Sequence, residues 1–138
     1  MLWAVGSHLN TVYGLTPLFR NAKLSSLSEP VEFSNGMILH AFHQTFGTLD
    51  GADGHWIDLE WTTVVTLGRN YSVSVQALNW DVQSNLAKYG QQDSYPGAGN
   101  WPTTRWVPEM IIRDRYFVPG SGKETMIGIF VYDLDSGE

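Results

Sequence analysis

The sequence predicts an all-β protein, a two-sheet antiparallel β-sandwich that is jelly-roll-like or immunoglobulin-like. Apolar and polar residues alternate from Trp56 to Leu67 and again from Tyr71 to Ala77, a pattern that is typical of strands with one buried face. Turn-forming residues separate short apolar runs, as at Asn35-Gly36, which is a strong hairpin signal. No helical periodicity is found after Pro30. Short strands with frequent turns favour a sandwich.

The N-terminal part is apolar and is expected to form a helical or extended arm. Residues Met1 to Phe19 contain no Asp, Glu, Lys or Arg. Gly6-Ser7-His8 interrupts this run, whereas a membrane-spanning helix needs about 20 predominantly apolar residues. The basic start of a signal peptide is also missing. We interpret residues 1–30 as an apolar arm followed by a linker from Ser25 to Pro30, and residues 31–138 as the β-sandwich domain.

Strands are expected along the whole domain, each bounded by turn residues. The last of them, Met126 to Tyr132, is apolar on both faces, which is typical of a central strand. Earlier strands are expected at Val31 to Phe33, Met37 to Phe46, Trp56 to Leu67, Tyr71 to Ala77, within Asp81 to Gln92, and at Met110 to Ile112 and Tyr116 to Val118. Long loops are expected at Gly47 to Gly54 and Asp93 to Thr104.

The charge and the cysteine content of the chain limit the functions that are expected. The net charge is -6, and the 8 Lys and Arg residues are scattered along the chain. Nucleic acid is therefore not expected as a partner, because phosphate binding needs clustered basic residues. The chain has no cysteine, which fits the cytosol and equally fits an exported domain that folds on its core alone.

Catalytic and metal-binding patterns are not found in the sequence. It has no G-x-S-x-G, no nucleophilic cysteine and no phosphate-binding loop. His40 and His43 lie three apart in an expected strand, so alternation points them to opposite faces. Asp58 and Glu60 share one face, where two acids are usually ordinary surface residues. We expect no catalytic residue, no metal and no cofactor; a small hydrolase that uses Asp58 or Glu60 with a histidine is ranked last.

The segment from Asp93 to Arg105 is the richest in binding-type side chains. It combines the flat rings of Tyr95 and Trp101 with the polar groups of Asp93, Asn100 and Arg105. Aromatic rings stack on the apolar faces of sugars while polar groups take the hydroxyls. These five residues are the candidate ligand-binding site. Trp106, in contrast, is expected to plug one end of the core.

A longer pattern runs through the second half of the chain. It comprises Tyr71-x-Val73-x-Val75-Gln76, Asp93-x-x-Pro96-x-x-Gly99, Pro102-Thr103-x-x-Trp106-x-Pro108, Asp114-x-Tyr116 and Gly128-x-x-x-Tyr132-Asp133-x-x-Ser136-Gly137. This pattern resembles the β-sandwich domain at the C-terminal end of many bacterial and archaeal membrane glycosyltransferases of the dolichyl-phosphate-mannose type, and of related uncharacterised membrane proteins. The resemblance implies an accessory, extracytoplasmic or membrane-associated domain without transferase activity.

The chain departs from that family pattern, and the pattern also has a mechanical interpretation. Glu109 stands where the family usually has glycine. Pro102 and Pro108 restrict the backbone around Trp106. Asp114 and Asp133 are expected to accept backbone N–H bonds near strand ends. A folding signature and a binding motif explain the pattern equally well.

Two functions are therefore carried forward. The first is a non-catalytic accessory module with weak carbohydrate or cell-envelope glycan binding. The alternative is a protein-interaction or oligomer-assembly module, in which the apolar arm from Trp3 to Phe19 packs on a second copy or on a membrane protein, since exposed apolar patches mark interaction sites.

Overall fold

The computed structural model describes residues 2–5, 10–14, 25–80, 83, 85–97, 99–124, 126–133 and 135–136. Within them the chain forms β-strands and a single short 3-10 helix, with no α-helix. None of the described residues belongs to a helix of the length and hydropathy that crossing a membrane requires. The elements are β1 (Leu2–Val5), β2 (Asn10–Gly14), β3 (Ser25–Glu32), β4 (Met37–Leu49), β5 (Ala52–Thr63), β6 (Tyr71–Trp80), β7 (Leu86–Ser94), η1 (Thr103–Arg105), β8 (Ile112–Pro119) and β9 (Met126–Asp133).

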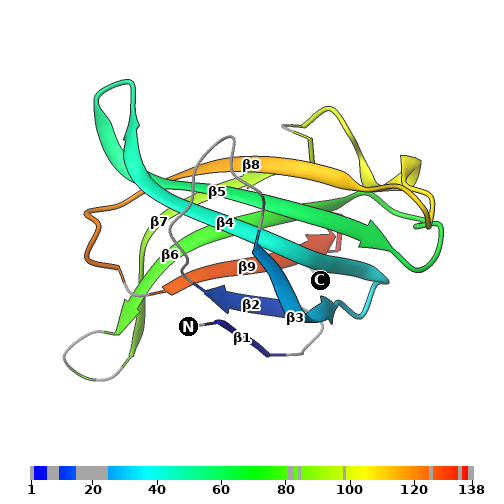
Figure 1. Cartoon of the computed structure of the whole chain (residues 1–138), viewed down its shortest axis with the longest axis horizontal. Helices are drawn as coiled ribbons and strands as arrows, with labels where there is room; N and C mark the ends of the chain where they lie inside the picture. The colour runs from blue at the N-terminus through cyan, green and yellow to red at the C-terminus, as the bar shows by residue number, and fades with distance from the viewer. Residues whose placement is uncertain are drawn as a thin grey trace.

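The strands form two antiparallel sheets that pack face to face (Figure 1). The five-stranded sheet has the order β1-β2-β9-β6-β7, and the four-stranded sheet has the order β3-β4-β5-β8. This arrangement confirms the all-β sandwich. β9 lies between β2 and β6, so the central position expected from its apolar residues is also confirmed.

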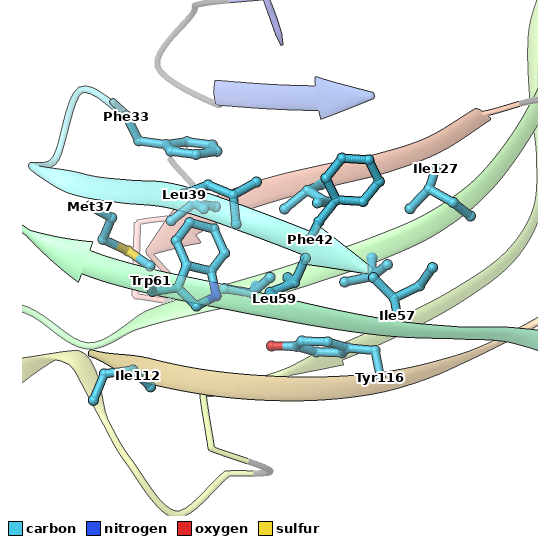
Figure 2. Packing of buried hydrophobic residues seen from close by; sticks show 14 of the residues in the cluster. Phe33, Met37, Leu39, Phe42, Ile57, Leu59, Trp61, Ile112, Tyr116 and Ile127 are labelled. Atoms are coloured by element: carbon cyan, nitrogen blue, oxygen red, sulfur yellow. The ribbon is translucent and has the colours of Figure 1, made fainter. Parts of the chain in front are cut away.

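The core lies between the inner faces of the two sheets. From the four-stranded sheet, Ile57, Leu59 and Trp61 of β5 point inward, as their alternation predicts (Figure 2). Burying side chains of this size stabilises a fold by about 1.5–3 kcal/mol each. Trp106 is fully buried in the same cluster, which confirms its expected place in the core. The five-stranded sheet contributes Val73, Val75, Ala77, Ile127, Ile129 and Val131.

In the N-terminal region, the stretch that was expected to be a linker is a strand. β3 includes the expected linker, Ser25 to Pro30, so this stretch belongs to the four-stranded sheet. Its pairing with β4 shifts register between Ser26 and Val31. Pro30 lies in this irregular part of an edge strand, where a residue without an N–H is tolerated. The described parts of the arm are extended: β1 and β2 pair with each other, and β2 pairs with β9. The rest of the arm lies outside the described residues.

The expected loop from Gly47 to Gly54 is instead a tight hairpin. β4 continues to Leu49, and β5 begins at Ala52. Asp50 and Gly51 between them have positive φ angles of 52° and 82°. Positive φ at both central residues is the requirement of the two-residue turn that Asp-Gly favours. The acidic and glycine residues therefore shorten this connection, and the hairpin extends beyond the sandwich (Figure 1).

The prediction that His40 and His43 face opposite sides is wrong because β4 contains a bulge. The register with β5 shifts between Leu39 and Ala41, and the extra residue reverses the alternation at that point. His40 Nε2 lies 2.6 Å from Thr62 Oγ1, while His43 pairs in register with Asp58. Both histidines are thus on the outer face of the four-stranded sheet.

The outer side of β6 is also more buried than its alternation predicts. Ser72 and Ser74 are only 3% exposed, although we expected a solvated face. By register they lie beside Tyr132 and Phe130 of β9. Directly opposite side chains on neighbouring strands are in contact distance. Each small serine therefore lies beside a large aromatic residue of β9, which reduces its contact with solvent.

A seam joins the edge strands β7 and β8 across the two sheets. Gln92 Oε1 of β7 accepts a hydrogen bond from the Phe117 N–H of β8 at 2.6 Å. At Gly90 the two backbones are so close that a Cβ would lie 1.9 Å from the Pro119 carbonyl oxygen. The edge of the four-stranded sheet is therefore covered by β7, and only glycine fits at position 90.

Replacement of Gly90 by alanine is expected to open this seam. The added methyl group collides with backbone, which cannot move as a flexible side chain does. We expect the free energy of unfolding to fall by about 2–3 kcal/mol, measured by urea unfolding. Gly68→Ala is the matched control, because a Cβ there meets nothing within 4 Å. Equal stability of the two variants would contradict the close packing of the seam.

Candidate functional site

A groove with a volume of about 370 Å³ lies where the loop after β7 meets the start of β8. One wall is formed by the loop, with Gly97, Asn100 and Trp101. The other wall is formed by residues 110–113, which lead into β8. The residues that line it are Gly97, Asn100, Trp101, Met110, Ile111, Ile112 and Arg113. Its surface is mainly apolar with a few polar groups, as in small-molecule sites generally.

Trp101 is held in place by contacts of its backbone and its ring nitrogen. Its N–H donates to the Pro96 carbonyl at 3.0 Å, and its carbonyl accepts from the buried Trp106 Nε1 at 3.1 Å. Its own Nε1 donates to Met110 Sδ at 3.3 Å. The side chain is nevertheless 38% exposed. Part of an ordered indole therefore faces solvent inside the groove.

Glycine at position 97 allows the loop to turn against this tryptophan. Gly97 has a φ of +68°, and a Cβ on it would lie 2.7 Å from Trp101 Cβ. Its N–H donates to Asp114 Oδ1 at 3.0 Å. Any other residue at this position would be strained and would push the tryptophan away.

Asp114 anchors the loop to β8 from a buried position. Its carboxylate also accepts from the Arg115 N–H at 3.1 Å and from the Tyr116 hydroxyl. Burial first, and then the nearby Asp114 carboxylate, raise the pKa of Tyr116 above its ordinary value. The tyrosine therefore stays a neutral donor. The expectation that Asp114 and Asp133 accept backbone N–H bonds is confirmed, since Asp133 accepts from the Asp135 N–H.

Arg113 is the charged residue of the groove. Its Nε donates to Glu60 Oε2 at 3.2 Å, and its side chain is 73% exposed. Arg113 was not among the residues predicted to bind ligand, because the sequence before it, Met110 to Ile112, indicated only a strand. Its place became clear only from the pairing of β5 with β8, which puts Glu60 opposite Arg113.

The structure brings together only two of the five residues predicted to bind ligand. Asn100 and Trp101 line the groove, whereas Asp93, Tyr95 and Arg105 do not. Asp93 accepts a hydrogen bond from Gln91. The Tyr95 carbonyl accepts from the Gly99 N–H and so helps to close the loop. Arg105 is exposed in η1.

The outer face of β5 and β8 has a second ion pair between an arginine and a carboxylate. Asp58 and Arg115 are opposite each other, and Arg115 donates through Nε and a terminal nitrogen to the two Asp58 oxygens. The bond to Asp58 raises the pKa of Arg115. On the other side of Asp58 lies His43, which is buried and whose ring nitrogens have no partner among the described residues. Burial lowers the pKa of His43, which favours the neutral imidazole.

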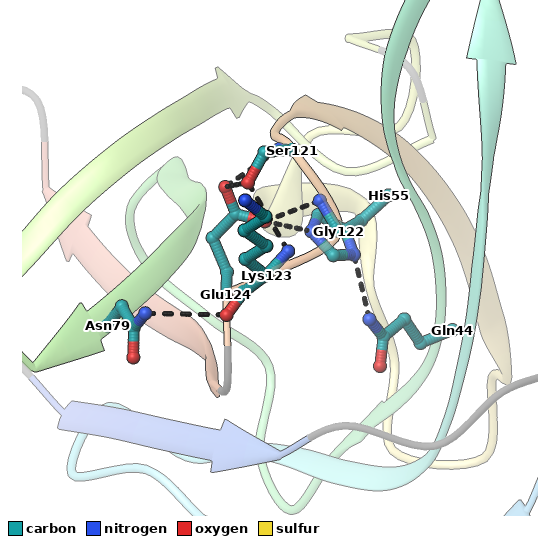
Figure 3. A network of polar contacts seen from close by, with 7 residues as sticks. All are labelled: Gln44, His55, Asn79, Ser121, Gly122, Lys123 and Glu124. Carbon is teal, nitrogen blue, oxygen red and sulfur yellow. Dashed lines mark hydrogen bonds and ion pairs between the residues drawn. The ribbon is translucent and has the colours of Figure 1, made fainter.

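Figure 3 shows a buried polar network. It includes residues 121–124, which follow the C-terminal end of β8, whereas the groove lies at the N-terminal end of this strand. His55 of β5 lies between two partners: its Nδ1 is 2.8 Å from Gln44 Nε2, and its Nε2 is 3.1 Å from Glu124 Oε2. His55 and Glu124 are 2% and 6% exposed. Glu124 also accepts from the Ser121 and Gly122 N–H groups at 2.8 and 2.9 Å. The network joins the β4–β5 hairpin to the β8–β9 loop.

Hydrogen bonds determine the charge state of Glu124. Burial by itself would raise the pKa of this carboxyl, but bonds from the Ser121 N–H, from His55 and from further donors outweigh burial and lower the pKa to about 2. The Ser121 hydroxyl also donates to Glu124, at 3.1 Å. The arrangement therefore stabilises a carboxylate.

The acids and histidines that were considered for catalysis or metal binding are placed as follows. The described residues contain no group of three or more His, Cys, Asp or Glu side chains placed to hold a metal ion. Asp58 and Glu60 share a face as expected, and each is bonded to an arginine. His55 is next to Glu124 and not next to either of these acids.

Comparison of the chain with protein-family models, with curated proteins and with solved structures gives no match. The resemblance to glycosyltransferase-associated domains stays a prediction based on residue order and spacing.

Acid is expected to weaken the fold through Glu124. Its pKa in the folded protein, about 2, is below the ordinary value of 4.5 for a glutamate side chain. The stabilising contribution is therefore complete above about pH 4.5 and is lost as the pH falls towards 2. The shift corresponds to roughly 3 kcal/mol. Urea unfolding of wild type and Glu124→Gln should differ strongly at pH 7 and converge near pH 2.

The control for this measurement is Glu109→Gln, because Glu109 is exposed and outside the network. This variant should follow the wild-type stability at every pH. A Glu124→Gln protein whose free energy of unfolding runs parallel to that of wild type from pH 7 to 2 would show that the network does not hold the carboxylate as described.

Proposed function

We propose that this chain is a non-catalytic accessory module that binds carbohydrate weakly, with a cell-envelope glycan as its ligand. The observation that carries the proposal is the groove in which a half-exposed, ordered Trp101 lies beside Asn100 and Arg113. A flat ring with neighbouring amide and guanidinium groups matches the apolar face and the hydroxyl rim of a sugar.

The size and shape of the groove support a small ligand with modest affinity. Its volume of about 370 Å³ is at the lower end of the range of about 300–1,000 Å³ for small-molecule sites. Trp101 is the aromatic side chain in its lining, so a single sugar ring would stack there. One stacking contact with few hydrogen bonds gives weak binding, since association must first offset the loss of translational and rotational freedom.

The biological context of the proposal comes from the resemblance noted above. An extracytoplasmic or membrane-associated domain next to a membrane glycosyltransferase would meet lipid-linked or polymeric sugars. Two of the three aspartates of the pattern, Asp114 and Asp133, accept hydrogen bonds from backbone N–H groups in this chain. One of these two, Asp114, bonds to Gly97, which lines the groove. We therefore place the proposed ligand at the Trp101 groove and not along the whole pattern.

Trp101→Ala is expected to abolish saturable sugar binding while leaving the fold intact. Alanine keeps the Cβ that packs on Gly97, and the buried Trp106 bonds to the backbone carbonyl of residue 101, so the loop retains its anchors. Loss of the indole should weaken binding at least about tenfold. NMR titration, guided by a glycan array, measures this.

Tyr89→Ala is the matched control, because Tyr89 is a 56% exposed aromatic residue on β7 and does not line the groove. It should bind as wild type does. A folded wild-type protein that binds no sugar at millimolar concentrations would rule out the proposal, and so would binding that survives in Trp101→Ala.

The second candidate is an assembly module, and the place of β1 favours it. β1 is an edge of the five-stranded sheet, and an unpaired edge offers backbone groups to another chain. A second copy or a membrane-protein partner would extend the sheet there.

Sedimentation across a range of protein concentrations tests this second candidate. If β1 pairs between copies, wild type should dimerise, and Ala4→Lys should shift it to monomer, since a charged residue on an edge strand disfavours pairing. A wild-type protein that is monomeric at every concentration contradicts self-assembly. Lys88→Ala on β7, at the opposite edge, is the control.

A further inference from the structure

We infer that the groove selects a sugar that carries a carboxylate, such as a uronic acid residue, and that Arg113 is the residue that selects it. This inference rests on the proposed function, because it names the class of glycan that the Trp101 groove takes. It comes from a difference between two arginines on the same face of β8.

Arg113 and Arg115 are two residues apart in β8, and each faces a carboxylate of β5 by register. Arg115 uses both its Nε and a terminal nitrogen on Asp58, and its side chain is 32% exposed. Arg113 donates to Glu60 through Nε alone among the described residues, and it is 73% exposed. The terminal nitrogens of Arg113 therefore remain in solvent at the rim of the groove.

These terminal nitrogens have the geometry that an external carboxylate needs. The guanidinium group donates two parallel N–H bonds to the two oxygens of a carboxylate, and such charge-assisted pairs are stronger than bonds to neutral hydroxyls. Glu60 accepts a hydrogen bond from Arg113 Nε. It therefore orients the guanidinium group and leaves the two terminal nitrogens uncovered. A carboxylate that approaches from the groove would complete the pair in the way that Asp58 completes the pair of Arg115.

Within the lining of the groove, the guanidinium group of Arg113 favours an acidic ligand at short range, and Glu60 neutralises part of its charge. Arg113 is the charged residue in the lining, and the remaining lining residues are apolar, glycine or amide. The net charge of the whole chain, -6, repels anions at a distance. Selection must therefore come from direct contact with Arg113 and not from long-range attraction. Because Trp101 lines the same groove, one sugar ring has both the indole and the guanidinium within reach.

The test is a paired NMR titration. Wild-type protein is titrated with glucose and glucuronate, and with galactose and galacturonate, at one ionic strength. We expect each uronate to bind roughly threefold to tenfold more tightly than its neutral partner. In Arg113→Gln this ratio should fall to about one. In Arg113→Lys, which keeps the charge but loses the paired bonds, it should be intermediate.

Arg105→Gln is the matched control, since Arg105 is an exposed arginine of η1 outside the groove and its loss should leave the wild-type ratio unchanged. Equal binding of uronate and neutral sugar by wild type, still dependent on Trp101, overturns the inference and leaves the proposed function standing. A uronate preference that persists in Arg113→Gln overturns the role of Arg113. Absence of binding to all four sugars overturns the inference together with the proposed function.

Discussion

The carboxylate of Asp114 is buried at the start of β8 and accepts hydrogen bonds from the N–H groups of Gly97 and Arg115 and from the Tyr116 hydroxyl. The groove depends on these bonds, because one of its walls is the loop that contains Gly97 and the other is the segment that leads into β8. If the loop moved away, a buried charge would lose a donor, at a cost of about 1–3 kcal/mol or more. The same loop orders Trp101 through Gly97. A single buried charge thus fixes the shape of the proposed binding surface.

Several residues of the pattern that resembles glycosyltransferase-associated domains make contacts inside the fold. Thr103 Oγ1 donates to the Arg69 carbonyl and accepts from the Tyr71 N–H, so η1 is fastened to the start of β6. Trp106 fills the core, and its Nε1 bonds to the backbone of Trp101. These contacts give the residues of the pattern a structural role that needs no ligand. The groove is formed beside this scaffold, by side chains such as Ile111 and Arg113 that are not part of the pattern.

Local patterns in the sequence were sufficient for the fold class and for much of the core, but not for the site. The alternation along β5 predicted that Ile57, Leu59 and Trp61 point inward, since burial on one face imposes a period of two. The bulge at His40 was not predictable, because an extra residue has no signature in the composition of a strand. Arg113 was missed for a related reason: its neighbour Glu60 is distant in sequence, and only the pairing of β5 with β8 brings them together. Asn100 and Trp101 were predicted to lie together because a single loop contains both, and both line the groove.

The seam between β7 and β8 has a consequence for how this protein behaves in concentrated solution. β8 is the last strand of its sheet, and the outermost strand of a sheet is ordinarily a template on which other chains add and aggregate. Here β7 of the other sheet lies against it, with Gln92 bonded to the Phe117 N–H and with Gly90 permitting the close approach. Because Gly90 has no side chain, β7 lies against this edge, and less of the edge is open to strand addition by another chain.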